Sequence, residues 1–403
     1  MSGMTTDVRT PVAIVGAGPA GLLLSHLLQA SGIDSIVFDS RSRDEIEHTI
    51  RAGILEQGTV DLLAESRASD RVREHASRHD GIELRFDGAG HRIDFADLVG
   101  RGVWLYPQHE VLKDLIAARL AAGQDIRFET TVEELSDAAT TRPHVHATTA
   151  DGDTLDVTAD IVVGVDGSHS VVRRTVSPDG GYFREYPFAW FGILCEAPPS
   201  AEELIYSTTD AGFALISQRS PTMQRMYFQC DPEADPEAPS ESEIWDILQS
   251  RVPGTTLNEG PIFQRDVLRF RSFVARELRA GRVALAGDAA HTVPPTGAKG
   301  MNLAVADIVL LHQAIDALLN RGDEGLLDRY AEAASVRIWK AQHFSWWMTS
   351  MLHSTLGAGS AGAPDASEFD DRRRHGELRS LVASRAGRTY LAEAYTGWPL
   401  ATF

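Results

Sequence analysis

The chain has 403 residues and carries 38 basic against 57 acidic side chains, a formal net charge of −19. Its 43% of hydrophobic and 24% of charged residues are ordinary for a globular protein of two or three packed units, and they exclude a disordered or collagen-like chain. A chain this acidic is a poor candidate for binding DNA or an anionic membrane through its overall field, so we expect neither as a partner.

Cysteines are sparse. Cys195 and Cys230 are the only two, which leaves no disulfide framework and no zinc-binding cluster, and we expect no metal ion. Few thiols and a polar first ten residues without a signal peptide favour a cytoplasmic protein. The most apolar stretch, residues 303–319, carries Asp307 and Asp316, so it predicts a buried amphipathic helix and not a membrane span.

The chain opens with a strand, a glycine-rich turn and a helix. Residues 11–15 are typical of a buried parallel strand, and they precede the motif Gly16-Ala17-Gly18-Pro19-Ala20-Gly21. The first glycine allows a tight turn, the second lets backbone approach a pyrophosphate, and the third lets the helix pack on the strand. A helix over residues 22–28 and a second strand over residues 36–38 follow, and Asp39 at its end can bind ribose hydroxyls. This pattern predicts a dinucleotide-binding unit without distinguishing FAD from NAD.

Later segments predict an α/β protein with a second sheet. The expected elements are short strands in 81–106, a helix in 110–121, strands in 125–163 and 283–286, an antiparallel sheet in 182–230, an exposed acidic loop in 231–237, a long helix beginning near Asn302 and a flexible connection in 357–364. We find no internal repeat.

Two further glycine and acid segments favour FAD. Gly164-Val165-Asp166-Gly167 follows a buried strand, and Gly287-Asp288 follows another with its acid placed to bind a polyol. The second segment leads through the glycine-rich loop 294–300 into the long helix. The amino end of that helix would favour a reduced, anionic flavin.

With these motifs in place, the chain resembles the class A flavoprotein aromatic hydroxylases. The matching strings are IRAGILEQG, ELIYSTTDAGFALISQRS, AGDAAHTVPPTGAKGMNLA, RIWKAQHFSWWMTSMLH and AEAYTGWP. The resemblance extends from about residue 11 to residue 399 and is closest to members that act on 4-hydroxybenzoate. It implies a Rossmann-like FAD-binding domain (1–80, 107–180 and 271–330), an inserted mixed or antiparallel-sheet substrate domain (81–106 and 181–270) and a C-terminal helical region (331–403).

The resemblance also implies the site residues. For the cofactors these are Gly16, Gly18, Gly21, Asp39, Arg51, Gln108, Asp288 and Asn302, with Arg225 and His169 linked to flavin position and nicotinamide contact. For the substrate they are Ser217, Arg219, Tyr227, Tyr206 and the Pro295 carbonyl. The catalytic set is Tyr206, Tyr395, Pro295 and His79, with His79 at the far end of a proton relay. The chemistry of Arg219 agrees with its place in the substrate set, because a planar guanidinium pairs bidentately with a carboxylate.

The implied reaction is hydroxylation of 4-hydroxybenzoate ortho to its phenol, with NAD(P)H, O₂ and a hydroperoxide formed at C4a of FAD, in a cytoplasmic homodimer. Related benzoates, 3,4-dihydroxybenzoate or 4-aminobenzoate, are alternative substrates. An NAD-dependent dehydrogenase is a second alternative, but it would not explain the segments at Asp166 and Asp288. A flavin redox sensor is a third, but it would not need Ser217, Arg219 and the two tyrosines together.

The coenzyme is where this chain departs from the best-known family members. Those prefer NADPH and carry an arginine directly after the ribose-binding acid and a tyrosine a few residues on, where this chain has Ser40 and Glu45. Thr49 also replaces an arginine. A 2′-phosphate needs cationic partners. We therefore predict that NADH is used at least as well as NADPH, unless Arg41 and Arg43 compensate.

Overall fold

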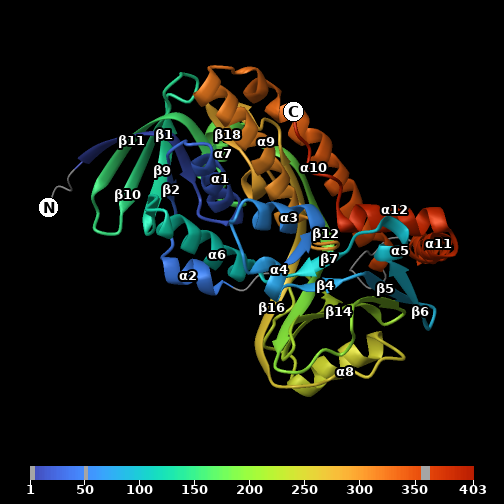
Figure 1. Ribbon diagram of the computed structural model, residues 1–403. Coiled ribbons are helices and arrows are strands. Elements are labelled where there is room, and N and C mark those ends of the chain that lie inside the picture. Colours follow the sequence, from blue (N-terminus) through green and yellow to red (C-terminus); the bar gives the residue numbers. More distant parts are fainter. Residues whose placement is uncertain (1–4, 50–52, 355–363) are drawn as a thin grey trace.

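The chain forms two eight-stranded sheets, one in each half of the molecule, and a separate small sheet of three strands (Figure 1). The computed structural model describes residues 5–49, 53–354 and 364–403. Its α/β architecture and C-terminal helices agree with the fold class predicted above.

The first sheet is the nucleotide-binding type. Its strands are β1 (Thr5–Val15), β2 (Ser35–Phe38), β8 (Ile126–Arg127), β9 (Thr130–Ser136), β10 (His144–Thr149), β11 (Thr154–Gly164), β17 (Arg279–Ala280) and β18 (Val283–Leu285). The order is β17-β18-β11-β1-β2-β8, and β1 runs parallel to both β11 and β2. The short apolar runs that predicted parallel strands therefore lie side by side in the sheet core.

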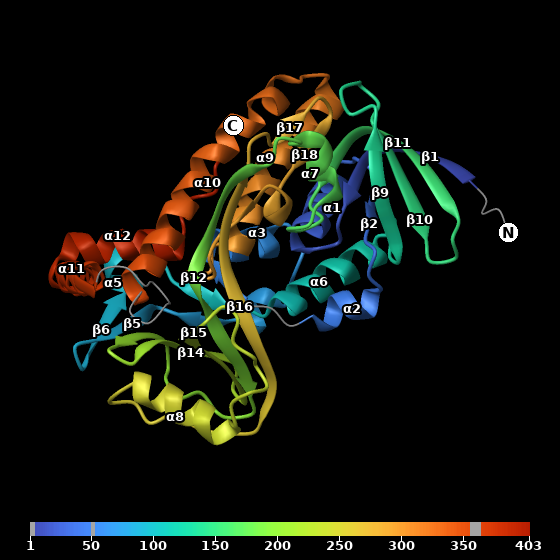
Figure 2. The same cartoon turned by 180° about the vertical axis from the view of Figure 1, so that it is seen from behind.

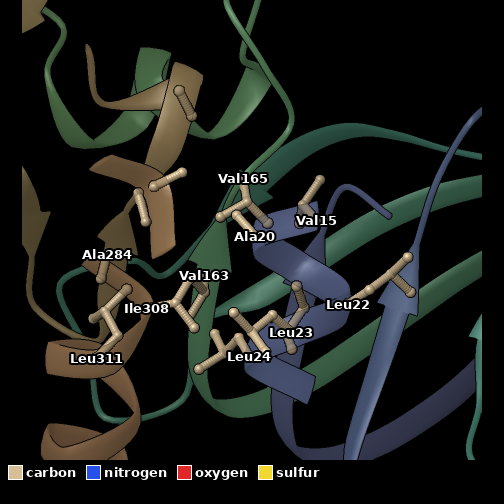
Figure 3. Packing of buried hydrophobic residues seen from close by; sticks show 14 of the residues in the cluster. Val15, Ala20, Leu22, Leu23, Leu24, Val163, Val165, Ala284, Ile308 and Leu311 are labelled. Carbon is tan, nitrogen blue, oxygen red and sulfur yellow. The ribbon is translucent and has the colours of Figure 1, made fainter. Parts of the chain in front are cut away.

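Helices α1 (Pro19–Ala30), α6 (Gln108–Ala121) and α9 (Gly300–Arg321) pack together beside this sheet. Figure 3 shows Leu23 and Leu24 of α1 and Ile308 of α9 gathered around Val163 of β11. By length and composition α9 could cross a membrane, but 78% of its most apolar window is buried inside the protein. It is a core helix, as the sequence predicted.

The second sheet contains β5 (Gly81–Phe86), β6 (Ala89–Asp94), β12 (Gly181–Cys195), β13 (Leu204–Thr209), β14 (Gly212–Ser220), β15 (Met223–Cys230), β16 (Ile262–Ala275) and β19 (His291–Thr292). Its order is β19-β16-β12-β15-β14-β13-β5-β6. Residues 182–230 form the predicted antiparallel strands, but β13 pairs parallel with β5, so the whole sheet is mixed. The helix α8 (Glu241–Arg251) covers one face, and an aromatic layer occupies the other.

The remaining elements lie around the two large sheets. They are β3 (Ile54–Glu56), β4 (Ser77–His79) and β7 (Val103–Leu105) of the small sheet, the helices α2 (Arg43–His48), α3 (Gln57–Glu65), α4 (Val72–His75), α5 (Phe95–Val99), α7 (Val171–Val176), α10 (Gly325–Leu352), α11 (Pro364–Ala383) and α12 (Arg385–Thr396), and the turn η1 (Gly287–Ala289). The helix α5 lies where only strands and turns were expected, and Asp94 caps it by accepting the Asp97 amide. The predicted connection 357–364 lies outside the described residues except for Pro364.

The domain boundaries stay a prediction. Figure 2 shows β12 and β16 running continuously from one half of the molecule into the other, so the two halves share strands. The same strands place the end of the aromatic layer close to the nucleotide-binding half.

Close packing of α7 on β11 makes a glycine necessary at the end of that strand. A Cβ on Gly164 would lie 2.6 Å from Cβ of Val172, whereas a Cβ on Gly376 of α11 would meet nothing within 4 Å. We expect Gly164→Ala to lower the free energy of unfolding by about 1–3 kcal/mol through overpacking. Gly376→Ala should raise it by about 0.5–1 kcal/mol through helix propensity. Urea unfolding of both variants measures this, and a Gly164→Ala protein as stable as the parent would contradict the packing argument.

Candidate active site

The glycine-rich turn between β1 and α1 fits a dinucleotide. A Cβ on Gly16 would lie 2.4 Å from the Val165 carbonyl oxygen, and one on Gly21 would lie 2.0 Å from the Gly16 oxygen, so a side chain fits at neither position. Beside Gly18, by contrast, the described residues leave the Cβ direction open to 4 Å, and no side chain caps α1 there. Open backbone next to free helix amides is the geometry that binds a pyrophosphate.

Asp39 lies at the end of β2, as predicted, and its carboxylate already has hydrogen-bond partners within the chain. Its carboxylate accepts the Ala17 amide at 2.8 Å and a two-pronged salt bridge from Arg41, with both contacts at 2.9 Å. The acid therefore holds the glycine turn in shape, and a ribose hydroxyl would share it with Arg41.

The two strand-end acids play different parts. Asp166 caps α7: its carboxylate accepts the Ser170 hydroxyl at 2.5 Å and the Val171 amide at 2.7 Å, and burial raises the pKa of Asp166. Asp288 is exposed in η1, and its carboxylate has no hydrogen-bond or ion-pair partner in the described part of the chain. Asp288 is thus the acid free to accept hydroxyl groups from a ligand.

A buried pair missed by the sequence argument holds η1 in place. Asp307 of α9 accepts the Gly287 amide at 3.0 Å and lies 2.6 Å from Nε2 of His291. Burial opposes charge on His291, but the Asp307 carboxylate outweighs it and raises the pKa of His291. The available signal was an aspartate within the apolar stretch of α9.

Asn302 does not direct its amide toward a ligand. Its oxygen accepts the Glu56 amide and the Thr59 hydroxyl, and its nitrogen donates to the carbonyls of Ile54 and Ala298. These contacts tie the start of α9 to β3, to α3 and to the preceding loop, so only the Asn302 backbone is left for the expected cofactor contact.

The other expected cofactor residues are spread around this region. Gln108 begins α6 and is half-buried, and His169 is exposed before α7. Arg225 pairs with Asp266 at 2.5 Å. Arg51 lies outside the described residues. Within the described residues, no three or more His, Cys, Asp or Glu side chains form a cluster that could hold a metal ion.

Aromatic side chains from adjacent strands of the second sheet form a continuous layer. Trp190 of β12 stacks on Phe213 of β14, with ring centroids 5.3 Å apart, and contacts Tyr227 of β15 at 4.9 Å. Tyr206 of β13 lies 6.3 Å from the Phe213 ring. This layer is an apolar wall suited to a flat ring, with polar groups at both ends.

At one end, the expected catalytic tyrosines meet. The hydroxyls of Tyr206 and Tyr395 lie 2.7 Å apart and both side chains are buried. Burial raises the pKa of Tyr206 to about 12, although contacts with Tyr395 and the Gly297 amide oppose the rise. The Pro295 carbonyl lies in the adjoining loop and accepts the Ala298 amide at 3.0 Å. Ala298 has φ +52°, a strained value typical of functional loops.

At the other end lies a cation without an anion. Ser217 and Arg219 project from β14, and the Ser217 hydroxyl donates to the Arg225 carbonyl at 2.6 Å. Arg219 forms no ion pair with any described residue, and its Nε is buried without a hydrogen-bond partner. Its guanidinium donates to the Gln218 carbonyl at 3.3 Å and also interacts with the Tyr227 side chain, and burial lowers the pKa of Arg219. An anionic group of a ligand would complete this site.

His79 lies on β4 and is buried, so it is not the end of a solvated helix. Its Nε2 lies 2.8 Å from Nε2 of Gln218, and burial lowers the pKa of His79. Because an amide nitrogen only donates, His79 Nε2 accepts. In the described residues no hydrogen bond joins His79 to Tyr206 or Tyr395. The structure thus brings the two tyrosines of the expected relay together, but it does not link His79, the expected far end, to them.

Two further buried pairs support the site and were missed. Lys299 donates to Glu56 at 2.6 Å and to the Tyr395 carbonyl at 2.9 Å, which anchors α12. His353 accepts the Trp190 indole N–H at 2.6 Å, and burial lowers the pKa of His353 to about 3. Both pairs join residues far apart in the chain, so spacing in the sequence gave no sign of either.

Comparisons with known proteins agree with this geometry. A family model described as FAD binding domain matches residues 9–345. The chain is 40% identical to p-hydroxybenzoate hydroxylase of Acinetobacter baylyi over 97% of this chain and 96% of that protein. Two solved structures share the fold at TM-scores of 0.73: p-nitrophenol 4-monooxygenase from Pseudomonas putida DLL-E4 (21% identity, covering 95% of this chain and 98% of that one) and OxyS anhydrotetracycline hydroxylase from Streptomyces rimosus (22%, covering 96% and 76%). The chain belongs to the FAD-binding-domain family and, within it, to the class A flavoprotein aromatic hydroxylases.

Proposed function

We propose that this protein hydroxylates 4-hydroxybenzoate ortho to its phenol, forming 3,4-dihydroxybenzoate with FAD, NAD(P)H and O₂. The observation that carries the proposal is the half-buried Arg219, whose Nε is buried and which has no acidic partner among the described residues, at the opposite end of an aromatic wall from the Tyr206–Tyr395 pair. A para-substituted phenolic acid matches both ends at once. The relative with 40% identity bears the name of this substrate.

The chain offers a complete set of groups for FAD. The open backbone at Gly18 would hold the pyrophosphate, and the carboxylates of Asp39 and Asp288 would accept hydroxyls of the ribose and ribityl chain. When bound, FAD supplies electron transfer from NAD(P)H to O₂ and delivery of one oxygen atom to the aromatic ring.

The residues at the carboxylate end bind and orient. The Arg219 guanidinium would take the substrate carboxylate in a bidentate pair, and the carboxylate would neutralise the unpaired charge of Arg219. Ser217 already donates to the Arg225 carbonyl, so its hydroxyl must turn to reach the same carboxylate.

The residues at the phenol end move a proton. A phenolate ring donates more electron density than a phenol, and Tyr206 would accept a hydrogen bond from the phenol and pass the proton to Tyr395. The Pro295 carbonyl would face the same oxygen. The aromatic layer of Trp190, Phe213 and Tyr227 would keep water away from the reacting atoms.

A cytoplasmic homodimer is part of the proposal. The sparse thiols support the compartment.

The direct test is turnover by the FAD-loaded protein. We expect NADH oxidation to accelerate when 4-hydroxybenzoate is added. Liquid chromatography should then show 3,4-dihydroxybenzoate accumulating in an amount equal to the NADH consumed. Parallel reactions with 3,4-dihydroxybenzoate and 4-aminobenzoate test the alternative substrates. Hydroxylation of either of these but not of 4-hydroxybenzoate would overturn the assignment.

Arg219→Ala should weaken substrate binding strongly. Removing one partner of a buried ion pair costs about 3–5 kcal/mol, a rise in the dissociation constant of roughly two to four orders of magnitude, and the half-exposed Arg219 should lie at the lower end. Arg219→Lys keeps the positive charge but loses the bidentate guanidinium. Its dissociation constant should therefore lie between those of the parent and Arg219→Ala. Titration of the FAD-loaded variants with 4-hydroxybenzoate measures this, with retained FAD showing that the fold is intact. Parent-like binding by Arg219→Ala would refute the carboxylate site.

Tyr206→Phe should bind FAD and substrate but hydroxylate poorly and release the reducing equivalents as H₂O₂. Tyr395→Phe should show a milder form, because Tyr206 still contacts the phenol. Tyr186, whose hydroxyl contacts Ser272 on the same sheet, offers Tyr186→Phe as the matched control with normal coupling. The ratio of product formed to NADH consumed decides, and tight coupling in Tyr206→Phe would show that the proton leaves by another route.

The arginines near the coenzyme segment are occupied by acids. Arg41 is bound to Asp39, and Arg43 donates to Glu47 at 2.6 Å. Glu45 completes a capping box with Ser42 at the start of α2, where its charge faces solvent. Neither arginine is therefore free to compensate for the residues that differ from NADPH-preferring members.

We expect kcat/KM with NADH to equal or exceed that with NADPH at saturating 4-hydroxybenzoate. Arg41→Ala and Arg43→Ala should leave the NADPH value nearly unchanged. A preference for NADPH of tenfold or more, about 1.4 kcal/mol, that disappears in either variant would assign 2′-phosphate recognition to that arginine instead.

A further inference from the structure

We propose that Asp266 sets the charge of the carboxylate end of the site, because its pairing with Arg225 leaves Arg219 as the one arginine, among the described residues of that end, without an acidic partner. The site would then select substrates whose acidic group carries a single negative charge. This inference deepens the proposed function and rests on it. Its test measures charge selectivity in ligand binding, separately from turnover.

Two arginines approach the carboxylate end from neighbouring strands. Arg219 of β14 interacts with the Tyr227 side chain, and the guanidinium carbon of Arg225 of β15 lies 4.9 Å from the centre of the same ring. Burial lowers the pKa of Arg219, and the like charge of Arg225 lowers it further. If both guanidinium groups were unpaired, they would repel each other and give this end two positive charges.

Asp266 of β16 neutralises one of these two arginines. Its Oδ2 lies 2.5 Å from Nη2 of Arg225 and also accepts the Gln264 amide at 3.3 Å. Its Oδ1 is buried without a hydrogen-bond partner in the described part of the chain. Burial opposes charge on Arg225, but contacts with Tyr227 and Asp266 outweigh burial and raise the pKa of Arg225. The salt bridge therefore keeps Arg225 charged and occupied.

A glycine on the intervening strand lets the two side chains meet. β12 lies between β15 and β16, and its Gly192 pairs with Tyr227 on one side and with Asp266 on the other. A Cβ on Gly192 would lie 2.5 Å from Oδ1 of Asp266 and 3.0 Å from Nη2 of Arg225. A larger residue would occupy the space in which the salt bridge forms. The strand register and this glycine together allow a salt bridge that spans a whole strand.

This arrangement favours an acid with one negative charge. A carboxylate would neutralise Arg219, whereas Asp266 already pairs with Arg225. The second charge of a doubly ionised head group would remain unpaired in a partly buried site, which is unfavourable. Without the Asp266 carboxylate, Arg225 would be available to that second charge. Asp266 is thus a positioning residue that acts on substrate choice through Arg225.

The test is calorimetric titration of the FAD-loaded protein with benzoate and with phenylphosphonate, at a pH where the phosphonate carries two negative charges. We expect the parent to bind benzoate more tightly. Asp266→Asn should shift the ratio of the two dissociation constants toward phenylphosphonate by about tenfold or more, because Arg225 then meets the second charge. Gly192→Ala, which displaces the Asp266 carboxylate, should shift the ratio in the same direction.

Two control variants separate charge from packing and from the overall charge of the protein. Arg225→Gln/Asp266→Asn removes both charges of the salt bridge and should return the ratio to the parent value. Glu233→Gln removes an exposed acid that pairs with Arg269 of β16 at 3.0 Å, and it should leave the ratio unchanged. Retained FAD absorbance in each variant shows that the fold is intact.

The outcomes distinguish this inference from the proposed function. If the parent binds benzoate more tightly and Asp266→Asn keeps the parent ratio, the inference is overturned and the proposed function stands. A double variant that stays shifted toward phenylphosphonate, or a parent that binds the two ligands equally, would also overturn the inference. A parent that binds neither ligand would contradict the proposed function itself, and this inference with it.

Discussion

A half-buried guanidinium without an acidic partner among the described residues is the constraint on which the rest of this site depends. Arg219 is half-buried beside the aromatic side of the second sheet, its Nε is shielded from solvent, and no described residue supplies an opposite charge. Such a group is costly to bury, and a bound anion relieves the cost. The site is therefore selective for acids before any other contact is considered, and the aromatic layer beside it narrows the choice to flat aromatic acids.

Strand register sets the length of that acid. Tyr206 of β13 pairs with Leu215 of β14, which in turn pairs with Tyr227 of β15, so the three residues form one line across the sheet. Arg219 lies four residues further along β14, a distance of roughly 13 Å at the rise of a strand. Alternation places Phe213, Leu215 and Ser217 on the same face, while α8 covers the other, and the register with β15 shifts between Gln218 and Ser220, next to Arg219. The hydrogen-bonding ladder thus fixes the separation between the carboxylate end and the phenol end.

Local patterns predicted the nucleotide-binding half well, because its parts are adjacent in sequence. The run before Gly16, the helix after Gly21 and the acid at position 39 all follow from strand and helix periodicity. The antiparallel strands of residues 182–230 were predicted equally well from the sequence. The parallel pairing of β13 with β5 was not, since it joins segments more than a hundred residues apart.

The hydrogen-bond partners of individual side chains explain most of what the sequence could not predict about the site. Asp166 and Asn302 have the residue types of ligand contacts, yet their side chains are used up by capping α7 and by tying α9 to β3. The bonds of Lys299 to Glu56, and of Trp190 to His353, depend on tertiary proximity that no local pattern encodes. The proximity of Tyr206 and Tyr395, by contrast, came from the family resemblance, and the structure brings the two hydroxyls within 2.7 Å.

The central claim is that a half-buried Arg219 without an acidic partner makes this an acid-selective site. Calorimetric titration of the FAD-loaded protein with 4-hydroxybenzoate, benzoate and phenol measures it most directly. The account predicts that 4-hydroxybenzoate and benzoate both bind, because each brings a carboxylate, and that phenol binds at least about a hundredfold more weakly than 4-hydroxybenzoate. Binding of phenol as tight as that of 4-hydroxybenzoate would contradict the claim.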